Sequence, residues 1–189
     1  MKLDKLTIFS FLALIVIAAV YRIIPDRAPG FAPQIAMAFF GGSVIKDKKW
    51  AFALPILSIF ISDLLYQGMY SLGWTIIPGF YNGQLTNYIL FALITALGFL
   101  IRKPSFFNIA LMSVVAPTIY FFLSNFAVWF SGVGGLQRPR TFEGLMQAIT
   151  DGLPFYRNSI VATLFFAGLL FGGYSILKNY VLKPDLANK

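Results

Sequence analysis

Six apolar segments fill almost the whole of this 189-residue chain, and they limit its fold more than any other feature. A helix needs about 20 apolar residues to cross the hydrocarbon core of a bilayer, or somewhat fewer where the bilayer is thin. The segments cover residues 6–24, 31–45, 50–66, 85–101, 106–130 and 159–177. We therefore predict an all-α fold, a polytopic membrane helical bundle with about six transmembrane helices, which forms a single integral membrane domain over residues 1–189.

The composition agrees with a membrane location and restricts the chemistry. Apolar residues make up 58% of the chain and charged residues 12%, too few to cover a soluble protein of this size. The absence of Cys and His excludes disulfides, thiolate metal sites and the commonest general base. No Ser lies in a recognisable nucleophile motif. We expect no catalytic residue, no metal and no cofactor, and we predict that the protein is not an enzyme.

The basic residues divide by type between the connections of the predicted spans. One predicted face holds ten of the fifteen, which are Lys2, Lys5, Lys46, Lys48, Lys49, Arg102, Lys103, Lys178, Lys183 and Lys189. The opposite face holds only arginines, which are Arg22, Arg27, Arg138, Arg140 and Arg157. The positive-inside rule places the first face, with both termini, in the cytoplasm. Because the charges lie in short clusters between apolar segments, they do not indicate nucleic-acid binding.

An outer face with arginine alone is equipped for recognition. Arginine is preferred over lysine where a carboxylate or phosphate is bound through two hydrogen bonds, or where the guanidinium stacks on a ring. Alternatively, these arginines pair with Asp26, Glu143 and Asp151 and only fasten loops. The two long outer connections, 67–84 and 131–158, are the expected places for function. The aromatic residues of 67–84 suit the headgroup level, where a plain aromatic belt is the alternative interpretation.

The last outer connection predicts a short amphipathic helix. Thr141 can cap it, and Glu143 lies in its first turn. An apolar face at helical spacing follows, made of Phe142, Leu145, Met146 and Ile149. Gly152 is expected to end this helix, and Asn158 or Ser159 to cap the last span. We expect the short helix either to rest on lipid or to cover a pocket between the spans.

Polar groups at membrane depth are the next candidates. Asp63, preceded by Ser62, is the one carboxylate within a predicted span, and such a residue is paired or functional. It is expected to pair with an outer arginine such as Arg22 or Arg157, or else to contact a ligand. The fifth segment carries a polar stripe that should face protein or a cavity. This stripe consists of Ser113, Pro117, Tyr120 and Ser124, with Asn125 beside it.

Small residues four positions apart predict close helix packing at Ala38 with Gly42 and at Gly168 with Gly172. The second segment is short and begins with Phe31, Ala32 and Pro33. We expect it to be tilted or partly broken, with Pro33 in its first turn.

Four sequence motifs in this chain resemble those of a known family. They are APQIAMAFFGG at 32–42, SIFISD at 58–63, SNFAVW at 124–129 and GLPFYRNS at 152–159. Over nearly the whole chain they resemble a family of small uncharacterised bacterial membrane proteins. That family is similar to the S-components, the substrate-binding subunits of energy-coupling factor (ECF) vitamin transporters. The resemblance implies six helices with both termini inside, in the bacterial cytoplasmic (inner) membrane.

By this resemblance, the protein binds a vitamin-like small molecule near its outer face for uptake, and cobalamin is one candidate. The implied ligand-binding positions are Trp74, Asn87, Asn125, Trp129, Arg140, Tyr156, Arg157 and Asn158. The implied partners are the lipid bilayer, the ligand and an ECF transmembrane subunit with its ATPases. Docking on that subunit typically uses Ala-x-x-x-Ala in the first helix, whereas Ala13 is here followed by Ile17. The protein acts either with an ECF-type module or alone.

A different class of function remains open. The rod-shape membrane protein shares a similar six-helix plan and binds proteins instead of solutes. Short loops and small-residue seams fit such a membrane scaffold equally well. The alternative hypothesis is therefore an interaction protein of this kind.

Overall fold

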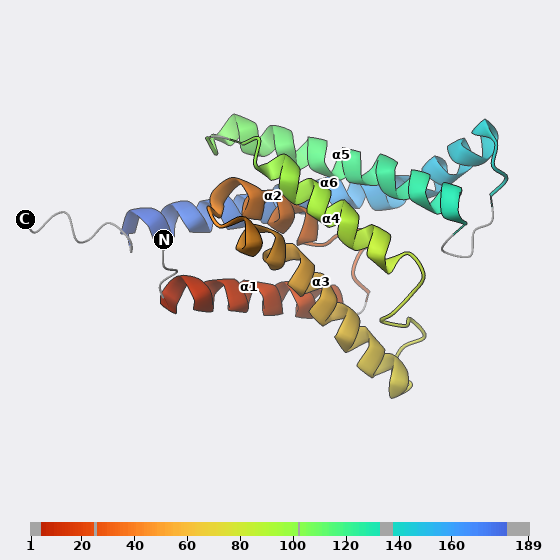
Figure 1. Ribbon diagram of the computed structural model, residues 1–189, viewed down its shortest axis with the longest axis horizontal. Coiled ribbons are helices and arrows are strands. Elements are labelled where there is room, and N and C mark those ends of the chain that lie inside the picture. Colours follow the sequence, from red (N-terminus) through yellow and green to blue (C-terminus); the bar gives the residue numbers. More distant parts are fainter. Residues whose placement is uncertain (1–4, 25, 102, 133–137, 181–189) are drawn as a thin grey trace, which may run out of the picture.

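Six helices follow the six apolar segments of the sequence. The computed structural model describes residues 5–24, 26–101, 103–132 and 138–180, without the side chains of 5–11 and 177–180. Its helices are α1 (Lys5–Arg22), α2 (Gln34–Val44), α3 (Lys48–Ser71), α4 (Gln84–Gly98), α5 (Phe106–Ser131) and α6 (Phe142–Tyr180). They form one bundle (Figure 1), so the predicted all-α class is confirmed.

Three of the helices, α3, α5 and α6, are long and apolar enough to cross a membrane. Shorter apolar helices cover Leu12–Arg22, Gln34–Val44 and Gln84–Gly98. With 11 residues, α2 is about 16 Å long, roughly half the hydrocarbon thickness of a bilayer. Pro33 is the N-cap of α2, and its carbonyl accepts the first helical hydrogen bond, from the Met37 amide at 2.9 Å. The helix does not extend back to Phe31, because proline disfavours helical backbone at the residue before it. The second segment is thus shorter than the predicted 31–45.

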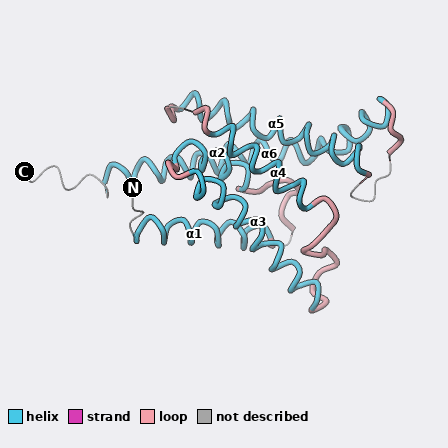
Figure 2. Tube along the Cα trace, in the orientation of Figure 1, coloured by secondary structure: helices cyan, strands magenta, loops and turns pink. Residues whose placement is uncertain are grey.

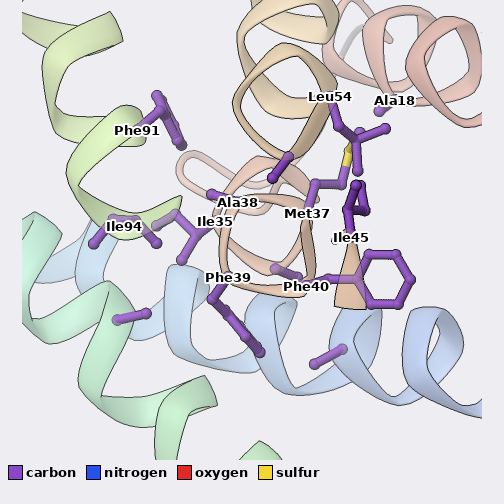
Figure 3. Packing of buried hydrophobic residues seen from close by; sticks show 14 of the residues in the cluster. Ala18, Ile35, Met37, Ala38, Phe39, Phe40, Ile45, Leu54, Phe91 and Ile94 are labelled. Atoms are coloured by element: carbon purple, nitrogen blue, oxygen red, sulfur yellow. The ribbon is translucent and has the colours of Figure 1, made fainter. Parts of the chain in front are cut away.

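The central element of the bundle is α2. It contacts α3, α4, α5 and α6, and every residue from Gln34 to Gly42 is buried. A helix that is apolar on all sides is typical of a protein core or of a membrane span, and α2 is enclosed by other helices. Figure 3 shows its side chains pointing outward to different neighbours, with Met37 toward Leu54 of α3 and Ile35 toward Ile94 of α4.

Glycines bring α2 close to α4. A Cβ added at Gly42 would lie 2.1 Å from the carbonyl oxygen of Thr95, and one at Gly98 would lie 2.5 Å from that of Phe39. These distances show that α2 and α4 meet backbone to backbone, as predicted for Ala38 and Gly42. At Gly168 and Gly172 an added Cβ would meet no described atom within 4 Å, so close packing at these two glycines stays a prediction.

The connections gather at two opposite ends of the bundle. The α2–α3 and α4–α5 connections lie at one end, with the beginning of α1 and the end of α6 (Figures 1 and 2). The end of α1 and the α3–α4 and α5–α6 connections lie toward the other end. Lys46, Lys48, Lys49 and Lys103 therefore occur at the first end, and the arginines Arg22, Arg138 and Arg140 at the second. Lys2, Arg102, Lys183 and Lys189, and the side chains of Lys5 and Lys178, lie outside the described residues.

Helix α3 is longer than its apolar segment. It continues beyond Tyr66 to Ser71, so the loop that was predicted to begin at Gln67 begins at Leu72. The loop returns to the bundle through Gly79, whose amide donates to the side-chain oxygen of Gln67 at 3.2 Å. Its large apolar residues are exposed, and they are Leu72, Trp74, Ile76, Ile77, Phe80 and Tyr81.

The predicted surface helix and last span are one helix, α6, and the expected end at Gly152 is wrong. Thr141 does accept a hydrogen bond from the Gly144 amide, as predicted for a cap. Gly152 continues the helix because it packs on α5, where an added Cβ would lie 2.6 Å from the Asn125 side chain. The buried face here consists of the small residues Gly144, Ala148 and Gly152, while Phe142 and Met146 are exposed. Small residues allow the two helices to approach closely, and the large apolar residues are left on the outer surface of the bundle.

Candidate ligand-binding cavity

A cavity of about 470 Å³ lies among α1–α6, toward the end of the bundle that holds the arginines. Its lining comes from the end of α1, the α1–α2 connection and α2, and from single residues or short stretches of α3 and α4, the second half of α5 and the first half of α6. The lining residues are Arg22, Arg27, Gly30, Ala32, Gln34, Ile35, Ile59, Asn87, Phe91, Pro117, Tyr120, Phe121, Ser124, Asn125, Val128, Arg138, Ala148, Asp151, Gly152, Phe155, Tyr156 and Ser159. The volume is that of a small-molecule pocket.

One wall is held by an ion pair between α1 and α3. Arg22 contacts the Oδ1 atom of Asp63, whose side chain is only 1% exposed. Gln84 and Tyr88, both in α4, donate to Oδ2 at 2.7 and 2.8 Å. The predicted pairing of Asp63 with an outer arginine is confirmed for Arg22. Because both carboxylate oxygens have partners, Asp63 fastens three helices and does not itself line the cavity.

Arg22 also has hydrogen-bond partners other than Asp63. Its guanidinium donates to the Ser62 hydroxyl at 2.5 Å and to the Ile59 carbonyl at 3.3 Å. The Tyr66 hydroxyl donates to the Arg22 carbonyl at 3.0 Å. Arg22 therefore contributes to the shape of the cavity, while its charge is balanced inside the protein.

The other two lining arginines come from connections. Arg138 pairs with Asp151, and both side chains are partly exposed, so the fastening role considered for outer arginines holds here. Arg27 donates to the Phe31 carbonyl at 2.5 Å, a contact within its own loop. Among the described residues no carboxylate pairs with Arg27, although Asp26 precedes it in the chain. Arg27 is thus the lining arginine whose charge is unbalanced.

Three side-chain atoms in the described part of the chain are buried without a hydrogen-bond partner: Arg27 Nε, Gln34 Oε1 and Arg138 Nε. All three belong to residues that line the cavity. Gln34 is 3% exposed, and its Nε2 donates to the Ala18 carbonyl at 3.3 Å while Oε1 is left over. A buried polar atom without a partner costs about 1–3 kcal/mol, so their gathering around one cavity is a sign of function.

The opposite wall is aromatic and is formed mainly by α5. Phe121 stacks on Tyr156 of α6 with ring centroids 4.6 Å apart, and Tyr120 meets Phe91 of α4 at 5.0 Å. The predicted polar stripe of α5 faces inward: Pro117, Tyr120, Ser124 and Asn125 line the cavity, and Ser113 is buried below it. This wall suits a flat apolar body with a few polar substituents.

A smaller cavity of about 290 Å³ lies next to the first, between the beginning of α4 and the end of α5. The two cavities share Asn87, Tyr120, Ser124 and Val128. The Tyr120 hydroxyl donates to the Asn87 side-chain oxygen and so links α4 to α5 at this shared wall.

The comparison with known families shows which family the chain belongs to. Residues 3–185 match the model of a family described as a family of unknown function, DUF6580. The chain belongs to DUF6580. No curated protein and no solved structure matches it.

In this DUF6580 chain, three of the eight predicted ligand-binding residues line the main cavity. Asn87 comes from α4, Asn125 from α5 and Tyr156 from α6. Tyr156 is held by the Phe121 ring and by a 2.8 Å hydrogen bond with the Thr118 hydroxyl. Their role in binding stays a prediction.

The other five lie away from the cavity lining. Trp74 is 73% exposed, because the extension of α3 carries its loop outward. Trp129 donates from its indole to the Pro139 carbonyl at 2.9 Å, and Arg140 lies over the Phe130 ring at 5.5 Å. Asn158 donates to the Pro29 carbonyl at 2.8 Å and ties α6 to the α1–α2 connection. Arg157 is exposed and does not reach Asp63.

Gln34, Phe91 and Phe121 line the cavity but were not predicted as site residues. Gln34 could have been found, since it is the single amide side chain within the apolar segment 31–45. The phenylalanines could not, because the chain has 21 Phe and nothing in the sequence distinguishes those that line the cavity. Asn87 was found through its position at the outer end of a span.

Proposed function

We propose that this protein is a solute-binding membrane component that takes up a vitamin-like small molecule from the outer side of the bacterial cytoplasmic membrane. In this proposal the six helices form a multi-pass membrane unit with both termini in the cytoplasm, and α2 is a buried half-length helix within it. Binding, without catalysis, is its role. The energy for uptake comes from an ECF-type ATPase module, or the protein acts alone.

The single observation that carries the proposal is the main cavity. It has ligand size, a wall of aromatic rings and buried polar atoms without partners, and it lies at the arginine end of the bundle. A scaffold would have no need for unpaired polar atoms around an internal cavity. Small-molecule sites combine a mostly apolar lining with a few polar groups in this way.

The cavity size narrows the candidate ligands. A volume of about 470 Å³ suits a drug-sized molecule. Cobalamin, with its corrin ring and nucleotide tail, is far larger, so a smaller vitamin-like molecule is the better candidate for this conformation.

A membrane location is supported by the outward surface. Large apolar side chains are exposed along the helices, among them Leu64 and Phe60 on α3, Phe122 on α5 and Phe165 on α6. A soluble monomer rarely exposes apolar surface of this extent. Lysines at one end and arginines at the other support the N-in, C-in orientation.

The experiment that tests this function is identification of a co-purified molecule. The protein would be purified in mild detergent from cells grown in rich medium, and released small molecules identified by mass spectrometry. We expect one drug-sized solute in near-stoichiometric amount, and faster cellular uptake of that solute when the protein is present. Absence of any solute, together with no binding across a vitamin panel, would contradict the proposal.

A second candidate function, a membrane scaffold, is favoured by one observation. Gly168 and Gly172 leave open space on the exposed side of α6, where a helix of another protein could approach closely. This candidate predicts that crosslinking from the Gly168 face captures an envelope protein, and that Gly168→Leu abolishes the capture without changing solute uptake.

A further inference from the structure

The charge balance of the cavity lining leaves one cation without a partner. Arg22 is neutralised by Asp63 and Arg138 by Asp151, whereas Arg27 forms no ion pair with any described residue. Arg27 is only partly exposed, and the cavity that it lines also has apolar side chains, including Ile35, Ile59 and Phe155. An unbalanced charge is costly in such a place unless a counter-ion arrives.

The buried polar atoms without partners include donors and an acceptor. Arg27 Nε and Arg138 Nε are donors and Gln34 Oε1 is an acceptor, and all three residues line the main cavity. A ligand that satisfies Arg27 and Gln34 must carry an acceptor group, best an anionic one, together with a hydrogen-bond donor. The aromatic wall of α5 then accommodates its apolar, ring-bearing body.

We infer that the cavity binds a small anionic molecule whose carboxylate or phosphate group is held by Arg27, with an N–H or O–H donor directed to Gln34 and an apolar ring against Tyr120, Phe121 and Tyr156. The inference rests on the proposed solute-binding function and names the ligand class for it. Arg27 and Gln34 are the residues that determine specificity. Asp151, the carboxylate in the lining, is paired with Arg138 and so does not compete for Arg27.

A carboxylate or phosphate group is present both in anionic solutes and in lipid headgroups. We assign the cavity to a ring-bearing solute. The main cavity is built from inward faces of the helices, including the buried beginning of α2, and small-molecule dimensions fit it. A phospholipid, in contrast, would have to place its two acyl chains outside the bundle. Binding of a phospholipid in place of a solute is one outcome of the test.

The test uses matched acid and amide pairs on the wild-type protein in nanodiscs of neutral phosphatidylcholine. The pairs are 4-aminobenzoate with 4-aminobenzamide, biotin with biotinamide, and indole-3-acetate with indole-3-acetamide. Within a pair the ring is the same, and the amide replaces one carboxylate oxygen with an uncharged NH2 group that donates instead of accepting. We expect at least one acid to bind, at least tenfold more tightly than its amide.

Variants then assign the charge to Arg27. Arg27→Gln should weaken binding of the acid at least tenfold and leave the amide unchanged, and Arg27→Lys should recover part of the affinity. Arg140→Gln is the matched control, because Arg140 lies in another outer loop outside the cavity lining. Gel filtration shows whether Arg27→Gln is folded, and the acid and amide comparison needs no variant.

The outcomes separate the inference from the proposed function. If amides bind as tightly as acids, or Arg27→Gln binds the acid normally, the inference is wrong while solute binding stands. If mass spectrometry finds only an anionic phospholipid that competes with every acid, the assignment to a solute is wrong. If neither acids, amides nor any co-purified molecule bind, the proposed function fails as well.

Discussion

Arg22 of α1 and Asp63 of α3 form a buried ion pair that also recruits α4. One carboxylate oxygen of Asp63 pairs with the Arg22 guanidinium, and the other accepts hydrogen bonds from the side chains of Gln84 and Tyr88. The pair borders the main cavity through Arg22 while Asp63 lies behind the lining. Its effect is to hold the first helix in place beside the ligand site.

Removal of one partner of this pair should be severely destabilising. Asp63→Leu leaves the Arg22 guanidinium without a counter-charge and the Tyr88 hydroxyl without its acceptor, and loss of one member of a buried pair typically costs about 3–5 kcal/mol. We expect a large fall in thermal stability in detergent, measured by the unfolding of the purified protein. Asp63→Asn should lose less, since the amide oxygen still accepts one donor. The double variant that combines Arg22→Leu with Asp63→Leu should lose less stability than the sum of the losses of the two single variants. Additive losses would argue against a direct pair.

The close contact of α2 with α4 should not tolerate a methyl group. Gly42→Ala places a Cβ 2.1 Å from the Thr95 carbonyl, and overpacking of this kind costs about 1–3 kcal/mol. Gly172→Ala is the matched control in a helix with open space, and it should be neutral or stabilising by up to about 1 kcal/mol. Thermal unfolding of both variants measures the difference. Equal stability of the two would contradict the arrangement of α2 and α4.

The charge of the cavity should be adjustable through Asp151. Asp151→Asn removes a carboxylate from the lining and frees Arg138, so an anionic ligand should bind more tightly, by about threefold to tenfold. Its stability should change by less than about 1 kcal/mol, because the pair is partly exposed. Glu143→Gln, an exposed residue in the same helix that does not line the cavity, is the control. Weaker binding by Asp151→Asn would show that the carboxylate contacts the ligand itself.

The hydrogen bond between Asn87 and Tyr120 should matter for binding more than for folding. Tyr120→Phe keeps the ring against Phe91 and removes only the hydroxyl, which typically costs about 1 kcal/mol of stability. Because this pair lies on the wall shared by both cavities, we expect loss of ligand affinity of several fold. Isothermal titration with the bound solute provides the measurement, and Tyr70→Phe, exposed and remote from both linings, serves as the control. An unchanged affinity would remove Tyr120 from the site.

The absence of cysteine makes the orientation directly measurable. Single cysteines at Trp74 and Arg140 should react with an impermeant maleimide in intact cells, whereas cysteines at Lys48 and Lys103 should react only after lysis. The reverse pattern would invert the topology. Equal labelling of all four positions in intact cells would argue against a bundle that crosses the membrane.

The amino-acid sequence by itself determined the helical class and the positions of the six helices. Long apolar stretches form helices wherever backbone groups must bond within their own segment, and this depends only on local residues. The polar stripe of α5 and the pairing expected for Asp63 followed from the same local reasoning. The sequence also marked the two ends of the bundle through the separation of lysine from arginine.

Tertiary structure alone decided which of these groups meet. Gly152 and Pro154 indicate a helix end locally, yet packing on Asn125 keeps α6 continuous. The short second segment becomes the buried centre of the bundle because its four neighbours enclose it. The balance of charge that separates Arg27 from Arg22 and Arg138 depends on carboxylates far away in the chain. Spacing along a helix cannot reveal such contacts, since each arises only when different helices approach one another.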